Sequence, residues 1–428
     1  MSINGSSGRS DRDALWRRTM ERAGGLAAGR RRRQRLLVTA PVVVLVLALT
    51  AGVVAAVVAT GGSAGRHLGA AGHGHSGTAP SSTIPSSTIP GSTSTVPGTT
   101  VPVHHAGVVK GFDPMSFTAV SLDHWWALGE VPCRHSHCAA IVETVNGGGT
   151  FSMVPVPAGL APKPNGETQI RFANSTDGYV IDSQLWATTD DGSHWVRQQL
   201  PGTVTAVETA DGEAFAITCD TQQCVLEEAA VGSGAWHTVA LPKQLPNVAF
   251  LSVVGSRVVV TSGAGQPPSV SYELSTDGGS TFSVGPTPCY PGLGGHVFAA
   301  VSAPSALWAA CPTGMLATPF ISTDNGSSWS GANHSQGTEF SNGLGIAPIS
   351  ASTALVWPFD NTGGLALTTN GGQSYTAVLD RGIGATTVWA GYSDPQRAYA
   401  IFATGVYSGE LWMSSDGGQT WSQVHFTS

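Results

Sequence analysis

Positive charge is scarce in most of this 428-residue chain. Residues 108–428 contain nine Lys and Arg against 24 Asp and Glu, a net charge of −15. A surface with this balance repels polyanions, because binding to phosphate groups depends on clustered Lys and Arg. We therefore expect no nucleic acid, and no anionic lipid surface, as the ligand of this region.

Catalytic motifs are also missing. The sequence has no Gly-x-Ser-x-Gly motif at a strand-to-helix turn, and little of it beyond residues 36–60 has a helical pattern. Its Gly-Gly pairs fall in short turns and not in a glycine-rich phosphate loop. The sequence therefore assigns no catalytic residue, no cofactor and no metal ion.

What the chain has instead is a repeated turn. Residues 414–421 read SSDGGQTW, in which a hydroxyl residue is followed by Asp or Asn, then Gly, then an aromatic residue. The same form occurs as TVNGGGTF (144–151), TTDDGSHW (188–195), STDGGSTF (275–282), STDNGSSW (322–329) and TTNGGQSY (368–375). The aromatic residues are about 45 residues apart except for one double step, where Trp236 marks a copy that has lost its acidic residue. Seven units of this length are typical of β-propeller blades.

The repeat predicts an all-β fold, a seven-bladed β-propeller of four-stranded blades spanning residues 108–428. In the first unit, strands are expected at 116–122, 124–131, 138–145 and 150–156, with the repeated turn between the third and the fourth. The chain would then run from the innermost strand of blade 1 to the outermost strand of blade 7. No strand exchange would close the ring, unless residues 107–111 add to blade 7.

Three residues of each repeated turn have a predicted structural role. Asp or Asn accepts backbone N–H groups, Gly supplies a conformation that other residues avoid, and the aromatic ring packs between neighbouring sheets. These residues are Asn146, Gly148, Phe151, Asp190, Gly192, Trp195, Asp277, Gly279, Phe282, Asp324, Gly326, Trp329, Asn370, Gly372, Tyr375, Asp416, Gly418 and Trp421, together with Trp236 of the degenerate copy.

The turns resemble the Asp-box, or BNR, repeat of sialidases, sortilin-type receptors, some glycoside hydrolases and photosystem assembly factors of the Ycf48 kind. The resemblance covers about residues 108–428. It implies that the box is a structural loop away from the active face, and not a source of catalytic acids or metal ligands. Sialidases of this kind hold the substrate carboxylate with three arginines, the first in an Arg-Ile-Pro motif. Here Arg171 precedes Phe172 and Ala173, and no Arg-Ile-Pro occurs, so the resemblance does not extend to sialidase activity.

The residues before the propeller predict a membrane anchor. Residues 1–35 form a basic tail with ten Arg, and residues 36–60 are 25 residues without charge, long enough for a transmembrane helix. The Arg cluster places the tail in the cytoplasm and the rest of this single-pass cell-membrane protein outside, with the lipid bilayer as the partner of residues 36–60. A cleaved signal peptide is the alternative, although its apolar core would be shorter. Residues 61–107, rich in Ser, Thr, Pro, Gly and His, are expected to be a disordered stalk.

Six cysteines, all beyond the predicted anchor, suit an oxidising exterior. Cys133 and Cys138 share a spacing with Cys219 and Cys224, and both pairs fall between a second and a third predicted strand. We expect both to be disulfides, which leaves Cys289 and Cys311 to pair, although six cysteines allow 15 connectivities. The alternative for the first pair is a metal site of Cys133, His135, His137 and Cys138.

Two sets of side chains are candidates for ligand binding. One is a set of carboxylates in inter-strand turns: Asp113, Asp123, Asp177, Asp360 and Asp394. The other is a set of aromatic residues outside the pattern of the second strands. They could stack on a sugar or a peptide, or simply pack against their neighbours: Trp125, Phe359, Trp389 and Tyr392. Aromatic residues that recur in the second strands are expected to be core: Trp126, Tyr179, Phe215, Trp308, Trp357 and Tyr399.

These observations favour a non-enzymatic protein, a displayed binding or scaffolding module for a cell-envelope protein or glycan. The alternative is an anchored glycoside hydrolase that uses two carboxylates at the mouth of the propeller channel. A sensor that passes a signal inward is a weaker third hypothesis, since the tail has no recognisable output domain.

Overall fold

The computed structural model describes residues 109–426, except for 135, 161–167, 247, 263–270, 291–293, 304, 314–315, 332–339, 342–343, 359–362 and 406–407. The predicted tail, membrane helix and stalk lie outside these residues. Within the described part of the chain, no helix has the length and apolar character needed to cross a membrane.

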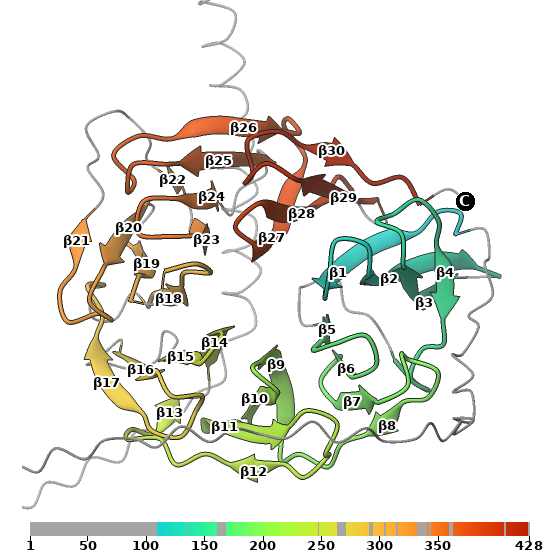
Figure 1. Ribbon diagram of the computed structural model, residues 1–428, viewed down its shortest axis with the longest axis horizontal. Helices are drawn as coiled ribbons and strands as arrows, with labels where there is room; N and C mark the ends of the chain where they lie inside the picture. Colours follow the sequence, from blue (N-terminus) through green and yellow to red (C-terminus); the bar gives the residue numbers. More distant parts are fainter. Residues whose placement is uncertain are drawn as a thin grey trace, which may run out of the picture. The chain divides into compact units, whose positions relative to one another are not determined.

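The described residues form seven antiparallel sheets arranged as a ring, and each sheet uses one continuous stretch of chain (Figure 1). Blade 1 consists of β1 (Asp113–Ala119), β2 (Trp125–Cys133), β3 (Ser136–Thr144) and β4 (Ser152–Val154). Blade 2 consists of β5 (Gln169–Phe172), β6 (Gly178–Ile181), β7 (Leu185–Thr188) and β8 (Val196–Arg197). Blade 3 consists of β9 (Thr203–Ala210), β10 (Glu213–Cys219), β11 (Gln223–Ala230) and β12 (His237–Thr238), with β13 (Leu245–Pro246) beside β11.

The remaining four blades repeat this plan. Blade 4 consists of β14 (Ala249–Val254), β15 (Arg257–Ser262), β16 (Ser271–Ser275) and β17 (Ser283–Pro286). Blade 5 consists of β18 (His296–Ala299), β19 (Leu307–Pro312), β20 (Leu316–Ser322) and β21 (Ser330–Gly331), with β22 (Phe340–Ser341) beside β20. Blade 6 consists of β23 (Leu344–Pro348), β24 (Ala354–Pro358), β25 (Gly364–Thr368) and β26 (Thr376–Asp380). Blade 7 consists of β27 (Thr386–Asp394), β28 (Arg397–Ala403), β29 (Gly409–Ser414) and β30 (Ser422–Gln423). The predicted seven blades of four strands are confirmed.

The second strand of each blade is buried on both faces, because a neighbouring blade covers each side. All six residues of β15 are buried, whereas both residues of β8, β12 and β21 at the outer edge are exposed. The six aromatic residues predicted as core are between 0 and 5% exposed: Trp126, Tyr179, Phe215, Trp308, Trp357 and Tyr399. Trp125 was a candidate for either a binding surface or ordinary packing, and the structure places it in the packed core. It is 0% exposed, since the side chains on both faces of β2 lie between blades.

Side-chain packing closes the ring between blades 1 and 7. The Phe112 and Phe426 rings lie 4.7 Å apart, and Phe117 stacks on Tyr399 at 4.0 Å. The backbone N–H of Gly409 donates a hydrogen bond to Asp113 Oδ1. Residues 109–111, the described part of the possible closing strand, are not in a strand, so no strand of the described chain joins the two ends.

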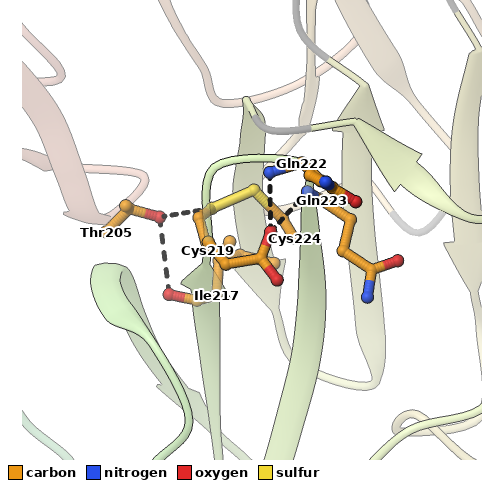
Figure 2. Close-up of a disulfide and its surroundings, with 7 residues drawn as sticks. Thr205, Ile217, Cys219, Gln222, Gln223 and Cys224 are labelled. Atoms are coloured by element: carbon orange, nitrogen blue, oxygen red, sulfur yellow. Dashed lines mark hydrogen bonds between the residues drawn. A yellow bond between two sulfur atoms is a disulfide. The ribbon is translucent and has the colours of Figure 1, made fainter.

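All three predicted disulfides are present: Cys133–Cys138, Cys219–Cys224 and Cys289–Cys311. The first two disulfides cross-link the ends of the turns between second and third strands, and the third joins the segment after β17 to β19. The alternative metal site at Cys133 and Cys138 is therefore wrong, because both sulfurs are bonded to each other. Figure 2 shows the second disulfide, beside which Asp220 Oδ1 accepts the N–H groups of Gln222 and Gln223 at 2.7 and 2.8 Å. These two backbone donors, that of Gln223 first, lower the pKa of the Asp220 carboxyl.

Candidate binding site in the central channel

The first strands of the seven blades face the centre of the ring (Figure 1). Their side chains line a cavity of about 470 Å³. These strands are β1, β5, β9, β14, β18, β23 and β27, and each contributes residues from its C-terminal half. In an up-and-down blade, the C-terminal end of the first strand is also the end at which the third strand turns into the fourth. The cavity thus lies in the half of the channel nearer to the repeated turns, and not at the opposite end as the resemblance would imply.

The cavity wall is mostly apolar. It carries aromatic side chains from five blades, among them Phe117, Phe172, Phe298 and Trp389. Trp389 and Tyr392, both predicted as candidate stacking residues, line this cavity from β27 and are partly exposed. Phe359, the remaining candidate of that set, lies outside the described residues. The wall is therefore suited to apolar or aromatic groups. Its hydroxyls at Thr118 and Ser252 already accept the N–H groups of Phe172 and Ala299 in the next blade.

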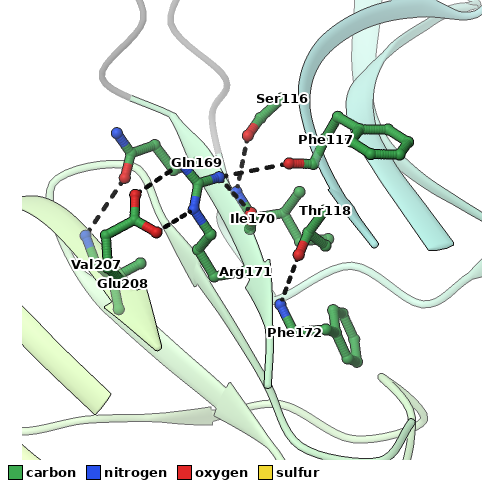
Figure 3. A network of polar contacts seen from close by, with 9 residues as sticks. All are labelled: Ser116, Phe117, Thr118, Gln169, Ile170, Arg171, Phe172, Val207 and Glu208. Carbon is green, nitrogen blue, oxygen red and sulfur yellow. Dashed lines mark hydrogen bonds and ion pairs between the residues drawn. The ribbon is translucent and has the colours of Figure 1, made fainter. Parts of the chain in front are cut away.

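One ion pair interrupts this apolar wall, between Arg171 of β5 and Glu208 of β9 (Figure 3). Arg171 Nε and Nη2 donate to the two carboxylate oxygens of Glu208, both at 2.9 Å, which is the paired geometry that a guanidinium and a carboxylate prefer. Arg171 Nη1 also donates to the Ile170 carbonyl oxygen at 2.8 Å, and Phe117 O of blade 1 lies at 3.5 Å. The pair therefore fixes blades 1, 2 and 3 relative to one another at the channel wall.

Hydroxyls of blade 1 order the strand that carries Arg171. Ser116 Oγ accepts the Ile170 N–H and Thr118 Oγ1 accepts the Phe172 N–H, both at 3.1 Å (Figure 3). On the other side, Gln169 Oε1 accepts the Val207 N–H at 3.3 Å. The backbone on both sides of Arg171 is thus held by the neighbouring blades, so the guanidinium has a defined direction before any ligand arrives.

The candidate carboxylates do not line this cavity. Asp123 and Asp177 lie in the β1–β2 and β5–β6 turns, and Asp394 at the end of β27 pairs with Arg397 at 3.0 Å. Asp113 begins β1, so it lies at the opposite end of its blade from Asp123 and cannot share a face with it. Asp360 lies outside the described residues. The idea that these five carboxylates gather at one face is wrong for Asp113, and the cavity wall contains none of the described four.

The repeated turns lie at the same end of the blades as the cavity, but none of their residues lines it, and they make the same contacts in six blades. At Asp416, Oδ1 accepts the Ser414 hydroxyl and the Thr420 N–H at 2.8 and 2.9 Å, and Oδ2 accepts the Thr420 hydroxyl at 2.6 Å. The Ser414 hydroxyl oxygen accepts the buried N–H of Gly418 at 2.9 Å. The corresponding contacts occur around Asn146, Asp190, Asp277, Asp324 and Asn370.

The closing aromatic residue of each turn packs on the preceding blade. Trp195 Nε1 donates to Pro155 O at 2.8 Å, and Trp329 Nε1 to Pro286 O at 3.2 Å. Trp236 does the same in the degenerate copy, where Nε1 donates to Gln198 Oε1 at 3.2 Å. The other closing rings lie in or against inter-blade clusters: Phe151, Phe282, Tyr375 and Trp421. The glycines of the turns have positive φ angles: Gly148, Gly192, Gly279, Gly326, Gly372 and Gly418.

Glu208 is a functional candidate that sequence reasoning missed, and Arg171 was noted only for lacking a sialidase motif. The two residues are 37 positions apart, and their meeting depends on how β5 and β9 of adjacent blades are aligned. The alternation of side chains along β5 could have placed Arg171 toward the channel. Nothing in the sequence identifies its partner among the many acidic residues.

Comparison with known proteins supports the fold. No model of a protein family matches the chain, and no curated protein matches its sequence. The structure is similar to that of Ycf48 bound to a D1 peptide, with a TM-score of 0.50 and 15% identity over 73% of this chain and 96% of that one. It is also similar to the β-propeller domain of the Trilobed protease from Pyrococcus furiosus, described as having an open velcro topology. That match has a TM-score of 0.50 and 10% identity over 73% of this chain and 98% of that one.

A match to the GH74 enzyme of Niastella koreensis has a TM-score of 0.30 and 13% identity over 74% of this chain and 72% of that one. Such a score is too low to carry an argument. At these identities the likenesses show a propeller fold alone. Whether the repeated turns make the chain a member of the Asp-box family stays a prediction from the sequence.

Proposed function

We propose that this protein is a membrane-anchored, non-enzymatic β-propeller that binds a peptide segment of a cell-envelope protein in its central channel. Residues 36–60 would be the anchor, residues 1–35 the cytoplasmic tail and residues 61–107 the stalk that carries the propeller outside the cell. The charge-free stretch of 25 residues and the Arg cluster before it support this arrangement.

The observation that carries the proposal is the chemistry of the channel wall. Aromatic and aliphatic side chains from all seven blades surround one ordered ion pair, Arg171–Glu208. Apolar walls with a few fixed polar groups are typical of sites that bind by shape and orient the ligand through a small number of hydrogen bonds. The Ycf48 structure that shares this fold holds a peptide, which is a precedent for peptide binding by a propeller.

The glycosidase alternative has less support at this site. Hydrolysis of a glycosidic bond needs two carboxyl groups facing each other at roughly 5–9.5 Å. Among the described residues of the cavity wall, Glu208 is the only carboxylate, and both of its oxygens accept from Arg171. A glycan as a bound, uncleaved ligand is the second candidate, because the partly exposed rings of Trp389 and Tyr392 could stack on a sugar face.

The test is a parallel screen of the full-length chain against a displayed library of extended peptides and an array of cell-wall glycans. Binders are then measured again with Trp389→Ala, which removes a channel ring, and with Val388→Ala, its neighbour in β27 that does not line the cavity. We expect saturable peptide binding that weakens about tenfold or more in the first variant and is unchanged in the second. Products from every glycan are analysed in the same screen, with Glu208→Gln as the control. Cleavage of a glycan that this substitution abolishes would overturn the proposal, and saturable binding of glycans alone would replace the peptide with a sugar.

A further inference from the structure

Three potential metal ligands meet between blades 1 and 2, apart from the cavity wall. His124 immediately precedes β2, Glu143 lies in β3, and Asp191 lies in the turn between β7 and β8. His124 Nε2 is 2.8 Å from Glu143 Oε1, and one ligand atom from each residue lies within 4.8 Å of the other two. Over the described ranges, this is the one group of three or more His, Cys, Asp or Glu side chains with such spacing.

Asp191 is unusual among the repeated turns. It has φ 59°, in the left-handed region, and the same position is glycine in four other turns: Gly147, Gly278, Gly371 and Gly417. In all of these turns the backbone N–H of this residue donates to a carbonyl oxygen of the turn between the first and second strands, which fixes the loop in the same way. The turn of blade 2 therefore does not need a side chain here, and it carries a carboxyl that reaches Glu143 of the neighbouring blade.

The three side chains are shielded from solvent on the Glu143 side and partly exposed on the His124 side. The Glu143 side chain is 5% exposed and that of His124 is 19% exposed. The Trp126 ring is fully buried, stacks on Phe172 and packs against His124 at 4.1 Å. Its indole N–H is buried and makes no hydrogen bond that meets ordinary distance and angle limits.

We propose that His124, Glu143 and Asp191 bind one Zn²⁺ ion that joins blade 1 to blade 2. Their ligand atoms lie within 4.8 Å of one another, so one cation placed among them could contact all three side chains. An imidazole nitrogen with carboxylate oxygens is a ligand set that Zn²⁺ accepts, with water as the fourth ligand. The site opens to solvent at the His124 side chain, which is 19% exposed, and such a water would bind there. It does not suit the six to eight oxygen ligands of Ca²⁺.

The experiment measures Zn²⁺ binding to the full-length chain after removal of metal with a chelator. Titration calorimetry with ZnCl₂ gives affinity and stoichiometry, and Co²⁺ in place of Zn²⁺ gives a visible spectrum that reports coordination number. The decisive variant is Asp191→Gly, which restores the residue found in four other turns and so removes a ligand without straining the loop. Its matched control is Asn325→Gly. Asn325 occupies the same turn position in blade 5, with φ 55°, and is likewise replaced by glycine.

We expect the wild type and Asn325→Gly to bind one Zn²⁺ tightly, with a rise in Tm, and Asp191→Gly to bind it at least about 100-fold more weakly. Weak binding by histidines of residues 61–107 would be equal in all three proteins and so cancels. His124→Gln is the second variant and should lose the same site. Equal tight binding by wild type and Asp191→Gly would overturn the proposal, as would a Co²⁺ spectrum of free aqueous ion or a site that takes Ca²⁺ in preference to Zn²⁺.

Discussion

The repeated turns and the channel wall are built on opposite principles. The turns use the same contacts in blade after blade, so that the bonds around Asp416 are found again around Asp277 and Asp324. The wall is different in every blade: its ion pair joins β5 to β9, and no second pair of this kind occurs among the described residues of the wall. The repeated part holds the ring together. The part that does not repeat is where this propeller can differ from others, and we therefore place recognition there.

The largest difference in unfolding free energy should appear when a tryptophan is replaced by alanine in the inter-blade core and, separately, in the channel. Trp308 is 0% exposed between blades 5 and 6 and donates its Nε1–H to Ser350 O at 2.8 Å, whereas Trp389 is partly exposed at the wall. Trp308→Ala should cost about 3–5 kcal/mol of unfolding free energy, because a large cavity forms. Trp389→Ala should cost much less. Denaturant unfolding of both variants checks this, and equal losses would remove the distinction between core and wall.

A smaller loss of unfolding free energy is expected when the Cys219–Cys224 disulfide of blade 3 is removed. Replacing Cys219 and Cys224 together with Ser opens a loop with a sequence separation of 5, which should cost about 2 kcal/mol through the entropy of the unfolded chain. The affinity for a channel ligand should not change, since neither cysteine lines the cavity. Thermal unfolding and a binding titration are measured on the same samples. A loss of affinity with unchanged Tm would show that the outer turns take part in recognition.

Removing one hydroxyl from a repeated turn should lower the unfolding free energy by a smaller amount again. Ser414→Ala leaves the buried N–H of Gly418 without its acceptor, for an expected loss of about 1–2 kcal/mol. Thr368→Ala should behave alike in blade 6, because Thr368 Oγ1 accepts the Gly372 N–H at the same 2.9 Å. Chemical denaturation of both variants compares the two turns. A loss in one and none in the other would argue that the copies are not equivalent.

The smallest effect expected is the response of the repeated turns to acid. Hydroxyl and backbone donors, the Thr420 hydroxyl first, lower the pKa of Asp416 to about 2, and Asp277 and Asp324 also have a pKa of about 2. A depressed carboxyl pKa stabilises the fold above the unfolded pKa, and that stability is lost as the pH falls from about 4 through about 2. Asp416→Asn should reduce this acid sensitivity with little loss at pH 7, because Asn146 and Asn370 already fill the same position. Tm measured against pH for both proteins is the check, and an unchanged acid profile would contradict the assignment.

The regular parts of this molecule could be predicted from the sequence and the irregular parts could not. Period, turn chemistry and cysteine spacing are local, so the seven blades, the core ring of Trp308 and the Cys219–Cys224 pair followed from short stretches of chain. Trp125 could not be assigned to core or binding surface, because β2 is covered on both faces and alternation along it does not separate the two. Contacts between blades, such as Arg171 with Glu208 or Asp191 with Glu143, depend on the alignment of separate sheets, which leaves no pattern in the sequence.

The central claim is that the channel wall, and not the outer edge of the blades, binds the partner. The most direct test introduces a photo-reactive amino acid at Trp389 in one strain and at Val196 in another, in cells that produce the full-length protein. Val196 is 64% exposed on the outer strand β8, so it controls for exposure alone. We expect a cross-link from position 389 that maps to one extended segment of an envelope protein, and none from position 196. Cross-links to the same partner from position 196 alone would contradict it.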